Sequence, residues 1–294
     1  MTFIDALILG LVEGITEYLP ISSTGHLILT TILLGIEQDG EIGKAIDSFN
    51  IVVQGGAILA VAGLYRSYVL QMLTGLLELF KHKQKTDNGL NGRKMFLKIA
   101  IAFFPAAILG PILNDKIEDN LFAPIPIAIA LGGGGVLMIF WNSFFGKLRR
   151  IAFMNNQKNT IQNLTIQGAL IIGIFQCFAM WPGTSRSMMC IIGGIAIGLR
   201  PKSAAEFGFL LGLPTLGGAC VYKLAKDQLN NGPGIFELLG PLQVITGIGI
   251  ATLSAALAIR WLISYLNKYG LSIFGWYRII LAMLILIFWN TGIK

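Results

Sequence analysis

The chain has 294 residues, of which 54% are hydrophobic and 13% are charged, and its formal net charge at neutral pH is +7. A mean hydropathy of +0.71 excludes an ordinary soluble domain, and apolar runs of about 18 residues or more recur, each long enough to cross a lipid bilayer. The positive charge does not indicate nucleic-acid binding, because the basic residues lie mostly between the apolar runs. The composition predicts an all-α polytopic membrane protein.

Two apolar regions are each interrupted by a polar turn that contains proline. The first is Phe3–Tyr18 followed by His26–Gly35, and the second is Ile166–Trp181 followed by Ser187–Leu199. A helix of about 11 residues covers about 16 Å, which is half of the hydrocarbon thickness. We therefore expect two re-entrant hairpins. The remaining apolar runs predict six full spans, at Asp47–Tyr65, Met95–Leu113, Leu121–Trp141, Ser203–Leu224, Gly240–Ile263 and Ile273–Trp289.

The charges of the connecting segments alternate along the chain. Basic residues gather in 66–98, 141–160, 200–202 and 260–268, whereas the intervening segments 37–41, 114–119 and 227–237 are acidic or neutral. The positive-inside rule then places the basic segments in the cytoplasm and both termini outside. The N-terminal apolar run has no basic residues before it, so we expect no removable signal peptide.

With this topology the two hairpins open to opposite sides, and each is followed by three spans. We therefore predict a single membrane domain, 1–294, made of inverted repeats at about 1–141 and 161–294 that are joined by a basic cytoplasmic loop, 142–160. The stretch LGLVEGITEYLPISSTGH resembles IGIFQCFAMWPGTSRS when one gap is allowed, and Glu13 then aligns with Gln176. Inverted halves bring their broken helices together near the bilayer midplane.

The first polar stretch, EGITEYLPISSTGH, carries two carboxylates on one helix face. Glu13 and Glu17 are four residues apart, so like charges meet in an apolar setting. A divalent cation, an arginine or protonation of one carboxylate would compensate. The alternative is that both side chains reach the membrane interface.

The same stretch continues with three hydroxyl residues and a histidine. If Ser23 or Thr24 caps the following helix, then Ser22 and its neighbours surround free backbone N–H groups, which bind anions. The alternative is that these residues only cap the helix. His26 is one of two histidines in the chain, and it is either functional or a buried structural residue.

The second polar stretch, WPGTSRS, supplies a positive charge. Arg186 offers paired donors that suit phosphate. The alternative is a structural salt bridge to Glu13 or Glu17, and one arginine can have both roles at once. Its neighbours contribute backbone N–H groups and hydroxyls to a phosphate site, from Gly183, Thr184, Ser185 and Ser187. If the two turns meet, they form a site suited to phosphoryl transfer.

The motifs EGITEYLPISSTGHL and WPGTSRS, in this order and setting, closely resemble the paired signatures of the BacA-type undecaprenyl-diphosphate phosphatase family. The resemblance covers nearly the whole chain. It implies a bacterial inner-membrane enzyme, often a homodimer, with six spanning helices and two re-entrant pairs. It also implies hydrolysis of undecaprenyl diphosphate to undecaprenyl phosphate and inorganic phosphate, lipid-carrier recycling for peptidoglycan synthesis, and bacitracin resistance.

Carried over by position, the resemblance implies a catalytic set in this chain: Glu13, Glu17, Ser23, His26 and Arg186. One departure is Cys190, which stands where family members commonly have threonine and which we leave outside the catalytic set.

The sequence leaves the attacking group open. A divalent cation, Mg²⁺ or Ca²⁺, would be held by Glu13 and Glu17, and the nucleophile would be Ser23, His26 or a water activated by a glutamate or His26. A second hypothesis from another class is a polyprenyl-phosphate transporter, because inverted repeats with broken helices are also a carrier architecture.

Overall fold

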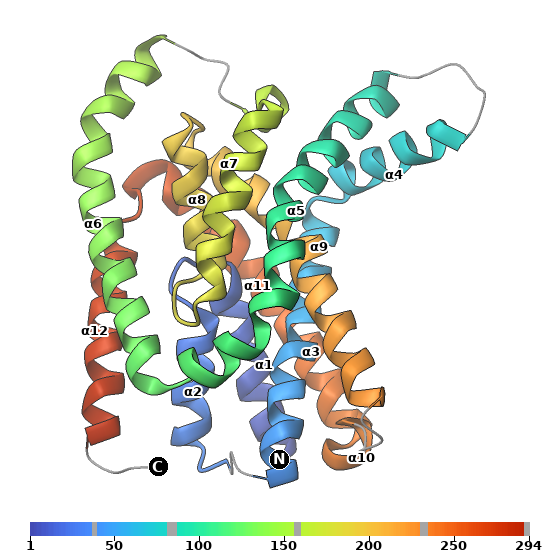
Figure 1. Cartoon of the computed structure of the whole chain (residues 1–294), viewed down its shortest axis with the longest axis vertical. Helices are drawn as coiled ribbons and strands as arrows, with labels where there is room; N and C mark the ends of the chain where they lie inside the picture. The colour runs from blue at the N-terminus through green and yellow to red at the C-terminus, as the bar shows by residue number, and fades with distance from the viewer. Residues whose placement is uncertain (37–39, 81–86, 156–159, 230–234, 291–294) are drawn as a thin grey trace.

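The structure is a computed structural model that describes residues 1–36, 40–80, 87–155, 160–229 and 235–290. Throughout this part of the chain every regular element is a helix, in agreement with the predicted all-α class. Figure 1 shows long helices aligned roughly along one direction, with shorter helices packed among them. The elements are α1 (Phe3–Tyr18), α2 (Ser23–Leu33), α3 (Gly40–Leu64), α4 (Arg66–Phe80), α5 (Asp87–Leu121), α6 (Pro124–Asn155), η1 (Ile161–Asn163), α7 (Ile166–Cys177), η2 (Phe178–Met180), α8 (Arg186–Ala196), α9 (Pro201–Leu229), α10 (Ile235–Leu239), α11 (Pro241–Tyr269) and α12 (Ser272–Asn290).

Six helices of the described chain are long and apolar enough to span a bilayer, which confirms the six predicted spans. No more than 56% of the most apolar window of any of them is buried inside the protein. The other apolar side chains face outward, as a bundle surrounded by lipid requires. The chain is therefore a multi-pass membrane protein, with spans at Ala45–Leu64, Asp87–Leu121, Pro124–Trp141, Pro201–Tyr222, Pro241–Tyr269 and Ser272–Trp289.

The four shorter helices of the two interrupted regions lie at opposite ends of the bundle. In Figure 1, α1 and α2 occupy the lower half and α7 and α8 the upper half. The bounds of α1 agree with the predicted Phe3–Tyr18, whereas α2 begins at Ser23 and α8 at Arg186, earlier than predicted. Each of these two helices therefore starts inside the polar turn, which brings backbone N–H groups of its first turn close to the functional side chains.

The ends of the two helix pairs are built alike. Thr2 caps α1 and Thr165 caps α7, and in each case the side chain accepts a hydrogen bond from the amide three residues further on. Ser22 caps α2 and Ser185 caps α8 in the same way, with φ values of 72° and 75°. They are the two non-glycine residues of positive φ in the described chain. Thr2 and Thr165 are 163 positions apart, and so are Ser22 and Ser185. The same local fold therefore occurs twice.

This spacing changes the register that we expected between the two polar stretches. The alignment needs no gap, because a shift of 163 positions matches Glu13 with Gln176 and Ser23 with Arg186. The predicted gap is not needed between these positions, because Ser22 and Ser185, the two serines with positive φ, are the structurally equivalent positions. The match of Ser23 with Arg186 means that the same place in the two turns carries a hydroxyl in one half and a cation in the other.

Close helix contacts hold the short helices against spans from the other half of the chain. Helix α1 packs on α11, and α7 packs on α5. Gly10 lies against Gly247, where an added Cβ would stand 2.6 Å from the Gly247 carbonyl oxygen, and Gly173 lies equally tightly against Ala102. Only glycine permits this approach of two backbones. Each turn is therefore fixed by a tightly packed helix.

Several segments predicted as loops are helical. Helix α4 lies in the region 66–98 that we expected to be a connector, and it packs along the first part of α5, beside the bundle in Figure 1. Residues 114–119 belong to α5, and residues 142–155 belong to α6. A helix can continue past the bilayer into water when its sequence turns polar, and the hydropathy pattern does not record this. The predicted loop at 81–86 and most of that at 37–41 lie outside the described residues.

Candidate functional site

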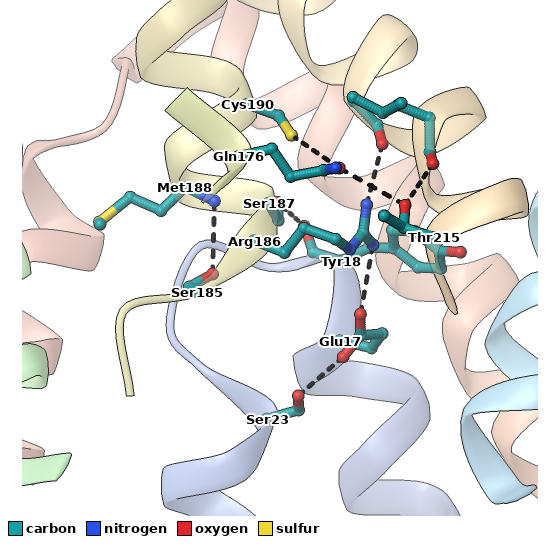
Figure 2. Close-up of polar contacts among 12 residues, drawn as sticks. Glu17, Tyr18, Ser23, Gln176, Ser185, Arg186, Ser187, Met188, Cys190 and Thr215 are labelled. Atoms are coloured by element: carbon teal, nitrogen blue, oxygen red, sulfur yellow. Dashed lines mark hydrogen bonds and ion pairs between the residues drawn. The ribbon is translucent and has the colours of Figure 1, made fainter. Parts of the chain in front are cut away.

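The two polar turns meet, and one carboxylate connects them. Glu17, at the end of α1, accepts a hydrogen bond from the Ser23 hydroxyl at 2.7 Å through Oε2. Its other oxygen, Oε1, is 3.2 Å from Nη2 of Arg186, which begins α8 in the second half of the chain. Figure 2 shows Glu17 between the serine and the guanidinium. Arg186 thus forms the ion pair that the sequence left as one alternative.

The surroundings of Arg186 fix its guanidinium in one orientation. Nη1 donates to the carbonyl of Gly208 in α9 at 2.9 Å, and the guanidinium carbon lies 5.4 Å from the centre of the Tyr18 ring. Ser187 donates to the Tyr18 carbonyl at 2.6 Å, so the start of α8 is bonded directly to the end of α1. These contacts, drawn in Figure 2, hold the two turns together through both backbone and side chains.

The predicted cap of α2 is wrong by one or two positions. The capping residue is Ser22, whose Oγ accepts from the Gly25 amide at 3.4 Å, rather than Ser23 or Thr24. The positive φ of Ser22 turns its side chain toward the helix, and this leaves Ser23 as the first helical residue with its hydroxyl directed at Glu17. Ser22 and Ser185 therefore shape the turns, whereas the Ser23 hydroxyl bonds to Glu17.

Glu13 is the most unusual group of the site. Its side chain is completely buried and lies against the Glu17 carboxylate, and apart from that second carboxylate no group among the described residues bonds to either of its oxygens. The alternative in which both glutamates reach the interface does not hold, because Glu17 is only 7% exposed. A buried carboxylate without a donor requires a proton or a cation.

The donor set around Glu13 is compatible with a divalent cation of the magnesium type. Among the described residues, no three or more His, Cys, Asp or Glu side chains lie close enough together to hold one metal ion. The two glutamates are therefore the available charged ligands here. Mg²⁺ is commonly held by one or two carboxylates together with substrate phosphates and water. Glu13 and Glu17 therefore fit a cation that binds together with a phosphorylated substrate.

A second polar group lies beside Arg186, and we did not include it among the site residues. The side-chain amide oxygen of Gln176, Oε1, accepts from the Thr215 hydroxyl at 3.4 Å and from the Cys190 thiol at 3.7 Å. Among the described residues, the Gln176 amide nitrogen and Arg186 Nε are buried without a partner. An unpaired guanidinium nitrogen and an unpaired amide nitrogen are both donors suited to an anion. The match of Gln176 with Glu13 was the sequence signal for this residue. Cys190 acts here as a weak donor in place of threonine.

His26 does not contact the Glu17 cluster. Its Nδ1 lies 2.7 Å from the Ser22 carbonyl oxygen and its Nε2 lies 2.7 Å from the hydroxyl of Tyr277 in α12. The two rings lie in nearly parallel planes, with centroids 5.5 Å apart and planes inclined by 4°. His26 is therefore bound to the same turn as Ser23 but takes part in a different set of contacts.

The remaining predicted residues contribute through the backbone. Gly183 has a φ of 92° and its carbonyl faces the interior, and the Thr184 amide donates to the Trp181 carbonyl at 3.1 Å in the turn. Thr24 lies in the first turn of α2, half-buried, next to Ser23. These residues define the shape of the turns around the central ion pair.

Arg278 is the residue whose role the sequence analysis missed. It is completely buried in α12 and donates to four carbonyl oxygens: Leu131 at 3.2 Å, Pro20 at 3.4 Å, Ala130 at 3.0 Å and Gly183 at 2.8 Å. Pro20 and Gly183 belong to the two turns, so one guanidinium joins both turns to α6. The signal was available, because a charged residue inside an apolar span is a functional candidate by itself.

Comparison with known proteins relates this arrangement to one family. The family model "Bacitracin resistance protein BacA" matches residues 6–284. The chain belongs to this family. The matched range contains both polar turns and every site residue described above, from Glu13 to Arg278.

Relatives of this BacA family chain are similar over almost their whole length. A protein named undecaprenyl-diphosphatase from Sorangium cellulosum is 41% identical over 288 residues, which are 97% of this chain and 86% of that protein. Proteins of the same name are 38% identical in Deinococcus deserti, over 100% of this chain and 98% of that protein, and 41% identical in Pseudomonas syringae pv. tomato, over 99% and 95%.

Proposed function

We propose that the chain is an integral membrane phosphatase that hydrolyses undecaprenyl diphosphate to undecaprenyl phosphate and inorganic phosphate. This reaction recycles the lipid carrier for peptidoglycan synthesis and confers bacitracin resistance. The observation that carries the proposal is the bridge from Ser23 through Glu17 to Arg186, in a chain of the BacA family whose relatives are named undecaprenyl-diphosphatase. A hydroxyl bonded to a carboxylate, with a guanidinium beside it, suits attack on phosphorus.

In this proposal Ser23 is the nucleophile and Glu17 is its base. Ser23 Oγ already donates to Glu17 Oε2, so the proton passes to that carboxylate as Oγ attacks the terminal phosphorus. The bond to the bridging oxygen breaks and undecaprenyl phosphate leaves. Water then hydrolyses the phosphoserine to inorganic phosphate. Arg186 binds the phosphate oxygens. Two buried donors that are unpaired within the described chain lie there: Nε of Arg186 and the side-chain amide nitrogen of Gln176. Attack by His26 receives less support, because Nε2 faces Tyr277.

We also propose a divalent cation, Mg²⁺ or Ca²⁺, as a cofactor. The support is the buried Glu13 carboxylate without a donor, next to Glu17. A bound cation would neutralise the carboxylates and the diphosphate. The two glutamates would hold it together with substrate oxygens.

The topology that we propose is an inverted repeat with two re-entrant hairpins. Its supports are the repeated caps at Ser22 and Ser185 and the positions of α1–α2 and α7–α8 at opposite ends of the bundle in Figure 1. The charge pattern supports a bacterial inner-membrane protein with both termini outside. Reporter fusions at each terminus test this orientation. A homodimer, which the family resemblance implies, is tested by sedimentation in detergent.

The prenyl tail would leave the site between α2 and α12. A small apolar groove there is lined by residues of α2, α6 and α12, of which Ile28 is two positions after His26. Its lining is entirely apolar, which suits an isoprenoid chain: Ile28, Leu29, Ile32, Pro124, Ile285, Phe288 and Trp289.

A transporter remains the rival from another class, and one experiment separates the two functions. Purified protein is reconstituted in vesicles with undecaprenyl diphosphate, and phosphate release and lipid translocation are measured together. Release of inorganic phosphate that depends on Glu17 supports the enzyme. Translocation without release would replace it with the carrier.

A further inference from the structure

Tyr277 lies on α12, outside both polar turns, yet it makes the closest side-chain contact to His26. Its hydroxyl is 2.7 Å from Nε2, and its ring is nearly parallel to the imidazole, with planes inclined by 4°. The tyrosine therefore restrains both the position and the plane of the imidazole. The neighbouring residue, Arg278, is bonded to the carbonyls of Pro20 and Gly183, so this part of α12 is itself anchored to both turns.

The hydrogen bonds of His26 identify its tautomer. Nδ1 lies 2.7 Å from the Ser22 carbonyl oxygen, which can only accept, so Nδ1 carries the proton. In the neutral imidazole Nε2 then has the lone pair, and the Tyr277 hydroxyl donates to it. The Ser22 carbonyl thus selects the tautomer in which Nε2 has a lone pair, and the tyrosine hydroxyl binds that lone pair.

The place of His26 in the turn links the imidazole to the proposed nucleophile. His26 is bonded to the carbonyl of Ser22, the residue that caps α2 and precedes the proposed nucleophile Ser23. Tyr277 is 43% exposed, so the shared hydrogen bond lies at the accessible side of the turn. The hydrogen bond from Tyr277 therefore holds the imidazole of His26 in one orientation relative to the first turn.

We propose that Tyr277 is a positioning residue for His26: it donates to Nε2 of the Nδ1–H tautomer and directs Nε2 to the accessible side of the first turn. This inference rests on the proposed phosphatase function and adds a residue to it. Tyr277 acts through His26 and does not itself touch the phosphorus atom.

The tautomer is tested without any substrate. The chain has two histidines, so protein labelled with ¹⁵N-histidine and carrying His82→Gln reports on His26 alone. We expect the Nδ1–H signature at neutral pH, with Nε2 as a hydrogen-bonded acceptor. In Tyr277→Phe, which keeps the ring and removes the hydroxyl, the Nε2 resonance should move toward that of a free acceptor. A wild-type spectrum of the Nε2–H tautomer overturns the proposal, and so does an unchanged Nε2 resonance in the variant.

Kinetics supply the second arm. Tyr277→Phe should lower kcat about tenfold and leave KM within about twofold, as the loss of a group that orients a functional residue does. Tyr269→Phe is the matched control, because that tyrosine of α11 is 65% exposed, and its kcat should be unchanged. Wild-type kcat in Tyr277→Phe, or an effect on KM alone, contradicts a positioning role. Absence of phosphate release by the wild-type protein contradicts the proposed function instead, and the tautomer measurement still stands.

Discussion

Arg186 and Glu17 are 169 positions apart in the chain, and their side chains form a buried ion pair at 3.2 Å. The arginine begins α8 and the glutamate lies at the end of α1, so the pair joins the two polar turns across the interior of the bundle. A buried charge that loses its partner is costly, by about 3–5 kcal/mol. Each of the two residues therefore depends on the other for charge compensation.

Replacement of Ser23 tests the proposed nucleophile. Ser23→Ala removes the hydroxyl that donates to Glu17, and we expect kcat to fall by about 10³-fold or more while the fold is retained. Rapid quenching with substrate labelled in the terminal phosphate should trap a phosphoenzyme in the wild-type protein and none in the variant. Ser67→Ala, at an exposed position of α4, is the control. A phosphoenzyme that persists in Ser23→Ala would assign the attack to another residue.

Glu13 should govern the dependence on a divalent cation. Chelation is expected to remove most phosphate release, and added Mg²⁺ or Ca²⁺ should restore it. Glu13→Gln should raise the cation concentration needed for half-maximal activity at least about tenfold, because one of two carboxylate ligands is lost. Glu118→Gln, in the exposed end of α5, should leave the titration unchanged. Full activity after exhaustive chelation contradicts this prediction.

Arg278 should stabilise both turns. Arg278→Met keeps a long side chain but removes the donor to the turn carbonyls of Pro20 and Gly183, at a cost of about 1–3 kcal/mol for each buried group that water cannot reach. The carbonyls of Ala130 and Leu131 also lose this donor but lie within α6. We expect a clear decrease in the thermal unfolding midpoint in detergent. Arg66→Met removes an exposed arginine from α4 and should have little effect. Equal midpoints for the two variants would show that the carbonyl contacts of Arg278 do not hold the turns.

The contact between α1 and α11 gives a prediction about packing. Gly10→Ile places a side chain against the backbone of Gly247, where even a Cβ would be 2.6 Å from the carbonyl oxygen, so the two helices must separate. The unfolding midpoint and the activity should both fall, because α1 carries Glu13 and Glu17. Gly63→Ile in α3 has no neighbouring atom within 4 Å of the added Cβ and is the matched control. Similar behaviour of both variants would contradict this account of the contact.

The hydropathy pattern was sufficient for the spans and for the two interrupted regions. Six apolar runs and the residues Pro20 and Pro182 located the long helices and the turns, because lipid requires long apolar segments and proline interrupts a helix. The pairing of Arg186 with Glu17 was also foreseeable, since a buried cation needs an anion. The pattern failed for α4 and for the extensions of α5 and α6, where a helix continues outside the most apolar window.

The details of the site depended on features that a sequence does not display. The positive φ of Ser22 decides which hydroxyl caps α2 and which one reaches Glu17. The hydrogen bond between Tyr277 and His26 joins residues 251 positions apart, and it depends on how α12 packs against the first turn. Arg278 is different, because a single charge within an apolar span was visible, and its position alone was reason to include it in the site.

The central claim is that residues from the two turns act as one site, and a double-mutant cycle on kcat/KM tests it most directly. Glu17→Gln and Arg186→Lys, singly and together, are compared for phosphate release from undecaprenyl diphosphate by purified protein. Each single change should lower kcat/KM by about 10²–10³-fold. The account predicts that the double variant is no worse than about tenfold below the poorer single variant, because groups that act as a unit are not additive. Losses that multiply would show that the two turns contribute independently and would contradict it.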